Sequence, residues 1–338
     1  MAGEPFRGYY RYLYPMKWFT PIQLPDYPFS IDHQTPVLAV GSCFAEQIGQ
    51  RLVDLQFDAV LNPFGILYNP ASVQRCFSRL ATGEPFTEAD LFAHNGLWHS
   101  FLHHGRFSAA TQAEALEKMN AALAKGHQQW QKADVIIVTL GTAWAYRHKA
   151  SCQIVANNHK QPQQHFDREL LTAEQIQGLL QSIIGPTLER NTPPQWLLTV
   201  SPVRHMKDGA VGNNRSKAHL LTAVHEMVSQ TEQVHYFPGY ELLLDELRDY
   251  RFYTADHAHP STEAVDHIWS RFGQVLLPEA TQALNGQLKA LRKAMQHRPL
   301  HPGTAAEQTF KQQQRARLDE LEQQYPFLDL SSWRDAFL

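Results

Sequence analysis

Cysteine and long apolar runs are scarce in this sequence. Its 338 residues include three cysteines, Cys43, Cys76 and Cys152. An odd, sparse set excludes a disulfide framework and is typical of a reducing compartment. No apolar run reaches the roughly 20 residues of a membrane-spanning helix. The opening residues, MAGEPFRGYYRYLYPMKWF, lack the apolar core of a secretory signal peptide. We therefore expect a cytoplasmic protein.

An excess of charge of one sign is also absent. The formal net charge is −3 and hydrophobic residues make up 43% of the chain, as in ordinary globular proteins. We expect neither nucleic acid nor a membrane as partner. No G-x-G-x-x-G follows the first predicted strand, which excludes a Rossmann dehydrogenase. Despite 18 histidines, H-E-x-x-H and paired C-x-x-C motifs are missing, so we expect no metal and no other cofactor.

Five short apolar runs predict buried strands. They are rich in β-branched residues and flanked by polar or turn residues, as parallel strands covered on both faces should be. Amphipathic helical segments lie between them, for example with Phe44, Ile48 and Leu52 on one face. Strands that alternate with helices predict a doubly wound α/β sheet. The runs are VLAVG (37–41), FDAVL (57–61), DVIIVTL (134–140), WLLTVS (196–201) and VHYFP (234–238).

The pattern divides the chain into three parts. Residues 1–35 form an N-terminal extension that packs on the core, and residues 36–285 form the α/β domain, with an insertion around 82–130. Within this region, HNGLWHSFLHHGRF (94–107) is expected to form a hairpin or a lid over one end of the sheet. Residues 286–338 form a helical C-terminal extension, in which Thr304 and Glu307 give a capping-box start. We expect this polar extension to be a solvated arm, with a surface available for a homo-oligomer.

Candidate catalytic residues follow the predicted strands, because ligands bind at the carboxyl ends of the strands in open α/β sheets. Ser42 and Cys43 follow the first strand directly. Asp256 and His259 lie three residues apart in a turn beyond the fifth strand. A carboxylate so placed can orient an imidazole whose other nitrogen faces a nucleophile. By itself the D-x-x-H pair is equally compatible with an ordinary helix start.

The segment GSCFAE, together with several later blocks, resembles the GSCFA family of the SGNH/GDSL hydrolase superfamily. The resemblance covers residues from about 10 to about 275 and excludes the C-terminal helical tail. The blocks are NPFGILYNPASV, TLGTAWAYRHK, IVANNHKQP, LTVSPVRHMKD, NRSKAHL and YFPGYELLLDELRDYRFYTADHAHPS.

This resemblance implies a three-layer α/β/α sandwich with a mostly parallel five-stranded sheet. Superfamily members are typically esterases, lipases or acyltransferases, often on O-acylated carbohydrates. Their nucleophile follows the first strand, and a late D-x-x-H pair supplies the orienting carboxylate and the base. Their oxyanion donors are the N–H of the nucleophile, a glycine after the second strand and an asparagine after the third. No metal is expected.

Two departures from the superfamily pattern concern the nucleophile and the oxyanion hole. An ungapped match puts Cys43 at the nucleophile, whereas a one-residue gap would put Ser42 there. We favour Cys43, because a helix N-terminus lowers the pKa of a thiol, and Ser42 is then free to cap the helix. Ala143 stands where the oxyanion asparagine is expected, and losing that donor costs several kcal/mol of transition-state stabilisation. The candidate compensating or substrate-binding residues are Asn62, Gly65, Gly141, Thr142, Asn157, His159 and Lys160.

The sequence therefore predicts an SGNH-like esterase or acyltransferase. Its substrate is expected to be an O-acyl group of a carbohydrate or related metabolite, on a small molecule or a glycan. If the oxyanion hole is lost at Ala143, the alternative is a carbohydrate-binding module with weak or no catalysis. A metal-dependent hydrolase is a weaker alternative, based on the histidines His94, His99, His103 and His104 in the insertion and the alternating pair His257 and His259.

Overall fold

The central sheet has five parallel strands, as the sequence predicts. The computed structural model describes residues 20–297 and 303–337. The strand order is β10-β9-β5-β1-β2, and every pair is parallel. The chain leaves β1 toward one edge and later crosses to the other side of β1, so the order reverses there. Ligands bind at such a reversal point in open α/β sheets. The strands are β1 (Val37–Gly41), β2 (Ala59–Leu61), β5 (Val135–Leu140), β9 (Gln195–Val200) and β10 (Val234–Tyr236).

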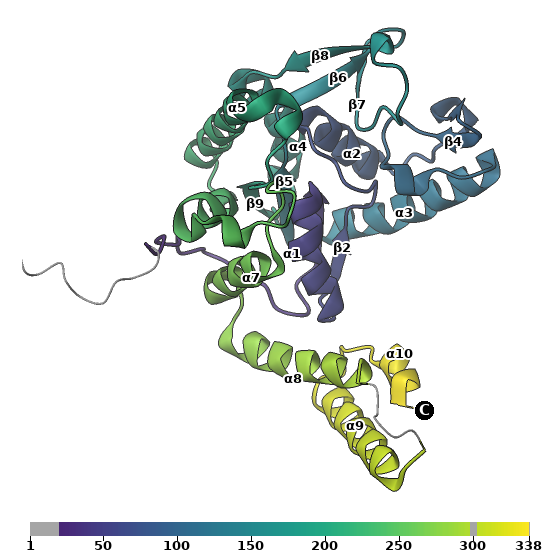
Figure 1. Cartoon of the computed structure of the whole chain (residues 1–338), viewed down its shortest axis with the longest axis vertical. Helices are drawn as coiled ribbons and strands as arrows, with labels where there is room; N and C mark the ends of the chain where they lie inside the picture. Colours follow the sequence, from purple (N-terminus) through teal and green to yellow (C-terminus); the bar gives the residue numbers. More distant parts are fainter. Residues whose placement is uncertain (1–19, 298–302, 338) are drawn as a thin grey trace, which may run out of the picture.

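Helices cover both faces of this sheet, which confirms the three-layer α/β/α architecture (Figure 1). Successive side chains of a strand point to opposite faces. Leu38 and Val40 of β1 accordingly join the core cluster on one face, while Val37 and Ala39 join the cluster on the other. The first face is covered by α2 (Pro70–Thr82), α3 (Gln112–Lys132), α4 (Ala173–Leu188) and α5 (Gly209–Gln230). The second is covered by α1 (Cys43–Asp54), α6 (Gly239–Glu241) with the π-helical turn Leu242–Leu247, and α7 (Thr262–Leu276).

A second, antiparallel sheet of three strands was not predicted from the sequence. It consists of β6 (Trp144–His148), β7 (Gln153–Val155) and β8 (Phe166–Leu170), in the order β7-β6-β8. Its strands are short and only partly buried, and Gln153, Asp167 and Arg168 are exposed. It begins directly after β5 and therefore stands beside the carboxyl edge of the central sheet (Figure 1).

The insertion contains the expected hairpin. Strands β3 (Phe92–His94) and β4 (Leu97–His99) pair antiparallel through a two-residue turn. Asn95 and Gly96 in this turn have φ values of 48° and 76°. Asn-Gly is the favoured pair for a turn with two positive φ angles, which explains the tight connection. The following helix α3 is a layer of the core, although the sequence analysis placed most of it within the insertion.

The described part of the N-terminal extension packs on the core. Ile31 is fully buried, and its N–H donates to the carbonyl of Leu276 at 2.7 Å. The N–H of Ile22 donates to the buried carboxylate of Glu246 at 2.5 Å. These bonds fix residues 20–35 along α7 and the π-helical turn. Residues 1–19 of the predicted extension lie outside the described residues.

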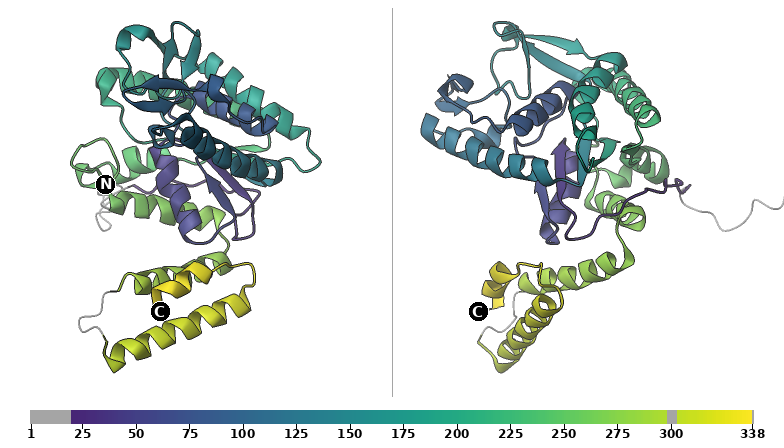
Figure 2. Two further views of the ribbon diagram at one scale, coloured as in Figure 1. Left: turned by 90° about the vertical axis from the view of Figure 1, so that its right-hand side faces the viewer. Right: turned by 180° about the vertical axis from the view of Figure 1, so that it is seen from behind.

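Three C-terminal helices pack together at one end of the molecule, beyond α7 (Figure 2). They are α8 (Glu279–Met295), α9 (Ala305–Gln324) and α10 (Ser331–Arg334). Leu288, Leu321 and Trp333 are buried in the same apolar cluster as α1 and α7. The expectation of a solvated arm is therefore wrong, because the few apolar residues of α9 meet those of α8 and α10. The boundary placed at residue 285 falls inside α8. A homo-oligomer through this extension stays a prediction.

Every helix within residues 20–297 and 303–337 is too short or too polar to span a bilayer.

Candidate functional site

Cys43 is the first residue of α1 and lies at the carboxyl end of β1. Its side chain is partly buried. The N–H groups of Cys43 and Phe44 face the sulfur and favour its thiolate form. The first N–H groups of a helix have no intrahelical acceptor, so they are available to a thiolate or a bound anion. The position therefore suits a nucleophile whose attack on a carbonyl group gives a negatively charged intermediate.

Ser42 precedes the helix and points into the protein. Only 1% of the residue is exposed, and its N–H donates to the carbonyl of Thr139 at 3.0 Å. Its hydroxyl is buried and has no hydrogen-bond partner among the described residues. Ser42 occupies the N-cap position of α1, but its side chain makes no capping bond. The prediction that the Ser42 side chain caps the helix is therefore wrong. Cys43 is more accessible than Ser42 and for this reason fits a nucleophile better.

The close approach of β1 to β5 requires glycine just before these residues. Gly41 has a φ of 150°, and a Cβ there would lie 2.2 Å from the carbonyl oxygen of Thr139. Any side chain would push the two strands apart. Gly41 therefore allows the chain to turn from β1 into α1 within one residue of the sheet.

The pKa of Cys43 is shifted in the opposite direction to the one predicted from the sequence. Burial raises the pKa of the Cys43 thiol above its ordinary value, and this effect outweighs the lowering by the N–H of Phe44 and by the Lys217 ammonium. The expectation of a lowered pKa is therefore wrong. The helix N-terminus acts as predicted, but a half-buried thiol also loses the water that would stabilise its charge. Cys43 consequently needs a base to react at neutral pH.

Alkylation of Cys43 by iodoacetamide should therefore be slow at pH 7 and accelerate as the pH rises. A raised pKa leaves little thiolate at neutrality, and the thiolate is the reactive form. The rate at Cys43 can be followed from pH 6 to pH 10 by mass spectrometry of the peptide that contains it. The exposed Cys152 serves as the internal control within the same chain. A Cys43 rate that exceeds the Cys152 rate at pH 7 would contradict the burial argument.

Asp256 and His259 form a hydrogen-bonded pair. The Nδ1 of His259 lies 2.6 Å from Oδ2 of Asp256, while Oδ1 accepts the N–H groups of Ala258 and His259 at 2.9 and 3.0 Å. The hydroxyl of Thr254 also donates to Oδ1, at 2.7 Å. The backbone N–H of His259, followed by the Thr254 hydroxyl, holds the pKa of Asp256 well below its ordinary value.

This pair fixes the tautomer of the imidazole. An ionised carboxylate only accepts hydrogen bonds, so Nδ1 of His259 must be the donor. The neutral ring then carries its lone pair on Nε2, the nitrogen that a general base uses. Within the described residues no hydrogen bond joins His259 to Cys43 or Ser42, so their convergence on one point stays a prediction.

Lys217 is a component of this region that was not predicted from the sequence. It lies on α5, is 1% exposed, and its ammonium donates to the carbonyls of Gly141 and Ser201 at 2.6 and 2.5 Å. Burial lowers the pKa of Lys217 to about 7, against a raising effect of Cys43. Lys217 thus joins the ends of β5 and β9 and lies within electrostatic reach of Cys43. Its position three residues before Leu220, on the buried stripe of α5, was the available signal.

His205 lies within electrostatic reach of both Lys217 and His259. It follows β9, and its ring packs edge-on against Tyr68 at a centroid distance of 5.5 Å. Burial, followed by the charges of Lys217 and His259, lowers the pKa of His205 to about 4. The N–H of Arg204 donates to the carbonyl of Ala258 at 3.2 Å, which ties the loop after β9 to the D-x-x-H turn. His205 is therefore neutral at physiological pH and takes no part as an acid there.

Asn62 lies directly beside the end of β1. Its Oδ1 accepts the N–H of Gly41 at 2.8 Å, and its Nδ2 is buried with no partner in the described part of the chain. A buried amide N–H without an acceptor is costly, and in native proteins such groups meet water or a ligand. Gly65, with a φ of 79°, lets the chain pass His104, whose Cβ would lie 2.3 Å from an added Cβ. The N–H of Gly65 itself donates to the carbonyl of Asn62 at 2.8 Å.

The segment after β5 uses its N–H groups internally. Gly141 and Thr142 both donate to the carbonyl of Tyr68, at 2.8 and 2.9 Å. Ala143 donates to the hydroxyl of Ser216 at 2.7 Å, and the Thr142 hydroxyl lies 3.0 Å from the same atom. Residues 141–143 themselves carry no side-chain amide that could replace the expected asparagine. In this structure, these three N–H groups are therefore unavailable to an oxyanion.

A cavity of about 310 Å³ lies between this segment and the second sheet. His104 of the insertion and Asn157 and Asn158 of the later loop border it together. His159 instead anchors that loop: it is buried, its Nε2 lies 2.8 Å from the carbonyl of Ser100, and burial lowers its pKa to about 4. Lys160 is exposed. Other residues that border the cavity include Tyr68, Thr142, Trp144, Tyr146, Arg168 and His205.

The histidines of the insertion have structural contacts. Nδ1 of His99 lies 2.6 Å from the Ser108 hydroxyl and its Nε2 lies 3.0 Å from the carbonyl of His94. His103 is fully buried between Phe64, Phe86 and Phe107. Across residues 20–297 and 303–337, no group of three or more His, Cys, Asp or Glu side chains could hold a metal ion.

Comparison with known protein families agrees with this architecture. The profile of the GSCFA family matches residues 36–272, which span the sheet, Cys43 and the Asp256–His259 turn. A second profile, described as the C-terminal domain of GSCFA domain proteins, matches residues 288–338. A search of curated proteins found no significant match. The first profile covers well over half of the chain, so this protein belongs to the GSCFA family.

Proposed function

We propose that this protein is an esterase or acyltransferase that uses Cys43 as nucleophile, His259 as general base and Asp256 as the orienting carboxylate. The observation that carries the proposal is the 2.6 Å bond between Nδ1 of His259 and Asp256. It leaves the basic nitrogen of His259 free, in a turn that the Arg204–Ala258 bond ties to the carboxyl end of β9. Cys43 lies at the carboxyl end of β1, two strands away in the same sheet.

The proposed reaction begins with a proton transfer. Nε2 of His259 takes the proton of the Cys43 thiol, and the thiolate sulfur attacks the acyl carbonyl carbon. A C–S bond forms and the carbonyl electron pair moves to oxygen. The intermediate then collapses, the ester C–O bond breaks, and the leaving alkoxide takes the proton from His259. Water or an acceptor hydroxyl, deprotonated by His259, attacks the thioester and releases Cys43.

The oxyanion requires donors other than the missing asparagine. The N–H groups of Cys43 and Phe44 are free of intrahelical acceptors, and Nδ2 of Asn62 has no acceptor among the described residues. These three donors surround the end of β1, where the carbonyl carbon would bind. Each donor of this kind is worth about 2.7–4 kcal/mol in acyl transfer. Asn62 thus takes the place that Ala143 cannot fill.

The cavity of about 310 Å³ supports a carbohydrate-like substrate. Its border combines the amides of Asn157 and Asn158 with the aromatic rings of Trp144 and Tyr146. Amides exchange hydrogen bonds with hydroxyl groups, and aromatic rings pack on the apolar faces of sugar rings. We therefore propose an O-acylated sugar or related metabolite as substrate, in the cytoplasm.

The test is the capture of the acyl-enzyme. Incubation with p-nitrophenyl acetate should release p-nitrophenol and add one acetyl group to the peptide that contains Cys43. Hydroxylamine should then remove the group, because it cleaves thioesters readily. Mass spectrometry of protein quenched in acid gives both results. Acetylation of Ser42 instead of Cys43, or repeated turnover without any acyl-enzyme, would contradict the proposed nucleophile.

A second candidate is a carbohydrate-binding protein without catalysis. It is favoured because the N–H groups of Gly141, Thr142 and Ala143 donate to other groups of the protein, so they cannot donate to an oxyanion. Binding of sugars, together with no p-nitrophenol release by the wild type, would support this alternative.

A further inference from the structure

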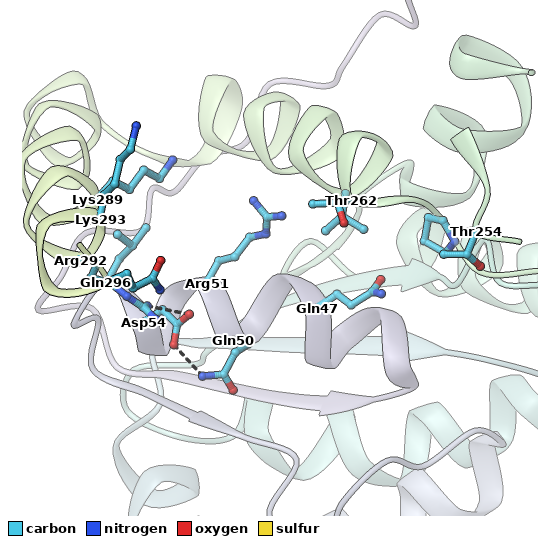
Figure 3. Close-up of a pocket in the computed structure, with 13 residues that line it drawn as sticks. Gln47, Gln50, Arg51, Asp54, Thr254, Thr262, Lys289, Arg292, Lys293 and Gln296 are labelled. Atoms are coloured by element: carbon cyan, nitrogen blue, oxygen red, sulfur yellow. Dashed lines mark hydrogen bonds and ion pairs between the residues drawn. The ribbon is translucent and has the colours of Figure 1, made fainter. Parts of the chain in front are cut away.

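A larger cavity lies on the other side of α1, between the central domain and the C-terminal helices. It measures about 630 Å³, is open to solvent, and is lined by α1, the start of α7 and α8 (Figure 3). Protein cavities that bind small organic molecules have volumes of about 300–1,000 Å³. A ligand of nucleotide size would therefore fit, and the C-terminal extension would form one side of its site.

The side chains around this cavity are mainly cationic. Arg51 on α1 points into it, and α8 contributes Lys289, Arg292 and Lys293 (Figure 3). Arg51 pairs with Asp266 at 2.6 Å and Arg292 pairs with Asp54 at 2.6 Å. Lys289 and Lys293 form no ion pair within the described residues. Four cations against two carboxylates leave a local charge of +2, in a chain whose formal net charge is −3.

Among the four cationic side chains around the cavity, Lys289 and Lys293 are therefore the two that are available to bind a ligand. Burial, followed by the charge of Arg51, lowers the pKa of Lys289, and the charge of Asp266 offsets only part of this effect. Such repulsion between neighbouring cations is relieved when an anion binds between them. Both lysines lie on one face of α8, four residues apart, so their ammonium groups can contact the same anion.

The cavity extends along the helix that carries the nucleophile. Gln47, Arg51 and Asp54 follow Cys43 on one face of α1, at spacings of four, four and three residues. A rise of 1.5 Å per residue puts Asp54 about 16 Å from Cys43 along the helix axis. At the end nearer Cys43, the carbonyl oxygen of the Gln47 side chain is buried and has no partner in the described ranges.

The same end of the cavity borders the catalytic turn. Thr254, whose hydroxyl donates to Asp256 at 2.7 Å, lines the cavity together with Pro260 and Thr262. Figure 3 shows Thr254, Thr262 and Gln47 at one end and the lysines of α8 at the other. A molecule in the cavity could thus have one end at Asp256 and His259 and its anionic end between Lys289 and Lys293.

We propose that this cavity binds the phosphate groups of a phosphorylated small-molecule substrate whose acyl end lies at Cys43. The inference rests on the proposed acyl transfer for the position of the acyl group, whereas phosphate binding follows from the cavity alone. Phosphate carries charge that Lys289, Lys293 and Arg51 complement, and the length of the cavity accommodates a linker between the phosphate and the reacting group. Coenzyme A has this chemistry, because a long arm joins its phosphates to the thiol that carries the acyl group, whereas a sugar phosphate is too short to reach Cys43 from the lysines.

Binding should be measured by isothermal titration calorimetry with Cys43→Ala protein of the full chain, in which no turnover occurs. The probes are coenzyme A, glucose 6-phosphate and inorganic phosphate, each at constant ionic strength set with chloride. At least one of the two organic phosphates should bind more tightly than inorganic phosphate. Coenzyme A as the tighter ligand would support a thioester donor whose acyl end lies at Cys43, whereas a preference for glucose 6-phosphate would contradict that placement of the acyl end.

The double variant Lys289→Gln with Lys293→Gln should weaken this binding about tenfold or more, since it removes two charged hydrogen-bond donors to the phosphate. The matched control is Lys118→Gln with Lys125→Gln, two exposed lysines of α3 on the opposite face of the sheet. It makes the same charge change and should leave binding unaltered. Circular dichroism and thermal melting would verify that both variants fold.

Equal weakening by the two double variants, or no binding of any probe in the Cys43→Ala protein, would overturn the proposal. These outcomes are distinct from failure of the proposed function. Phosphate binding in a protein whose wild type cleaves no ester would contradict only the acyl transfer. Ester cleavage by a protein that binds no phosphate would contradict only the role of the cavity.

Discussion

Replacement of Cys43 by alanine should reduce kcat/KM for p-nitrophenyl acetate by a factor of about 10⁴ or more, the scale seen when a catalytic nucleophile is removed. The reason is the geometry of the helix start: the Cys43 sulfur faces two N–H groups of α1, whereas the Ser42 hydroxyl is buried behind it. Ser42→Ala should therefore keep most of the activity. Initial rates of p-nitrophenol release at pH 8 measure both variants.

The Ser42 variant also serves as the structural control. Its hydroxyl caps no N–H and has no partner among the described residues, so its removal should change the free energy of unfolding by less than about 1 kcal/mol. Denaturant unfolding gives this value for both variants. An inactive Ser42→Ala protein of unchanged stability, with activity retained in Cys43→Ala, would reverse the assignment. A serine-directed fluorophosphonate would then label the wild type.

The central sheet could be predicted from the sequence because its strands carry their signal locally. β1, β5 and β9 are continuous apolar runs, and both faces of each are buried. The second sheet carries no such signal. β6 to β8 are short, partly exposed and rich in charged residues, such as Arg147 and Glu169, which pair with each other at 2.6 Å. Their pairing depends on tertiary contacts that a local pattern does not encode.

The candidate site likewise has features that a local sequence pattern predicts and features that depend on tertiary contacts. Asp256 and His259 interact within one turn, so their spacing of three residues, together with the resemblance to the GSCFA family, could predict the pair. Lys217 depends on two carbonyls that come from the ends of distant strands, and only its place on the apolar face of α5 indicated burial. The pKa of Cys43 also depends on tertiary burial, which is why the effect of the helix N-terminus alone gave the wrong sign.

Asp256→Asn should reduce kcat/KM at pH 7 by about 10⁴, a loss typical of the carboxylate-to-amide change in such triads. An asparagine amide turned toward Nδ1 of His259 would donate to it, and the imidazole proton would then lie on Nε2, where it blocks the base. His259→Ala removes the base itself and should cost at least about 10²–10⁴. Because burial raises the pKa of Cys43, neither variant has a preformed thiolate to use at pH 7.

The dependence of this loss on pH distinguishes a catalytic from a structural role. As the pH rises toward the pKa of the thiol, Cys43 ionises without a base, so the activity of both variants relative to wild type should increase from pH 7 to pH 10. Asp249→Asn is the matched control, since Asp249 is also exposed, lies in the preceding turn and likewise accepts a backbone N–H and a side-chain N–H. It should leave kcat/KM nearly unchanged. A deficit in Asp256→Asn that stays constant over this range would indicate that Asp256 only stabilises the turn.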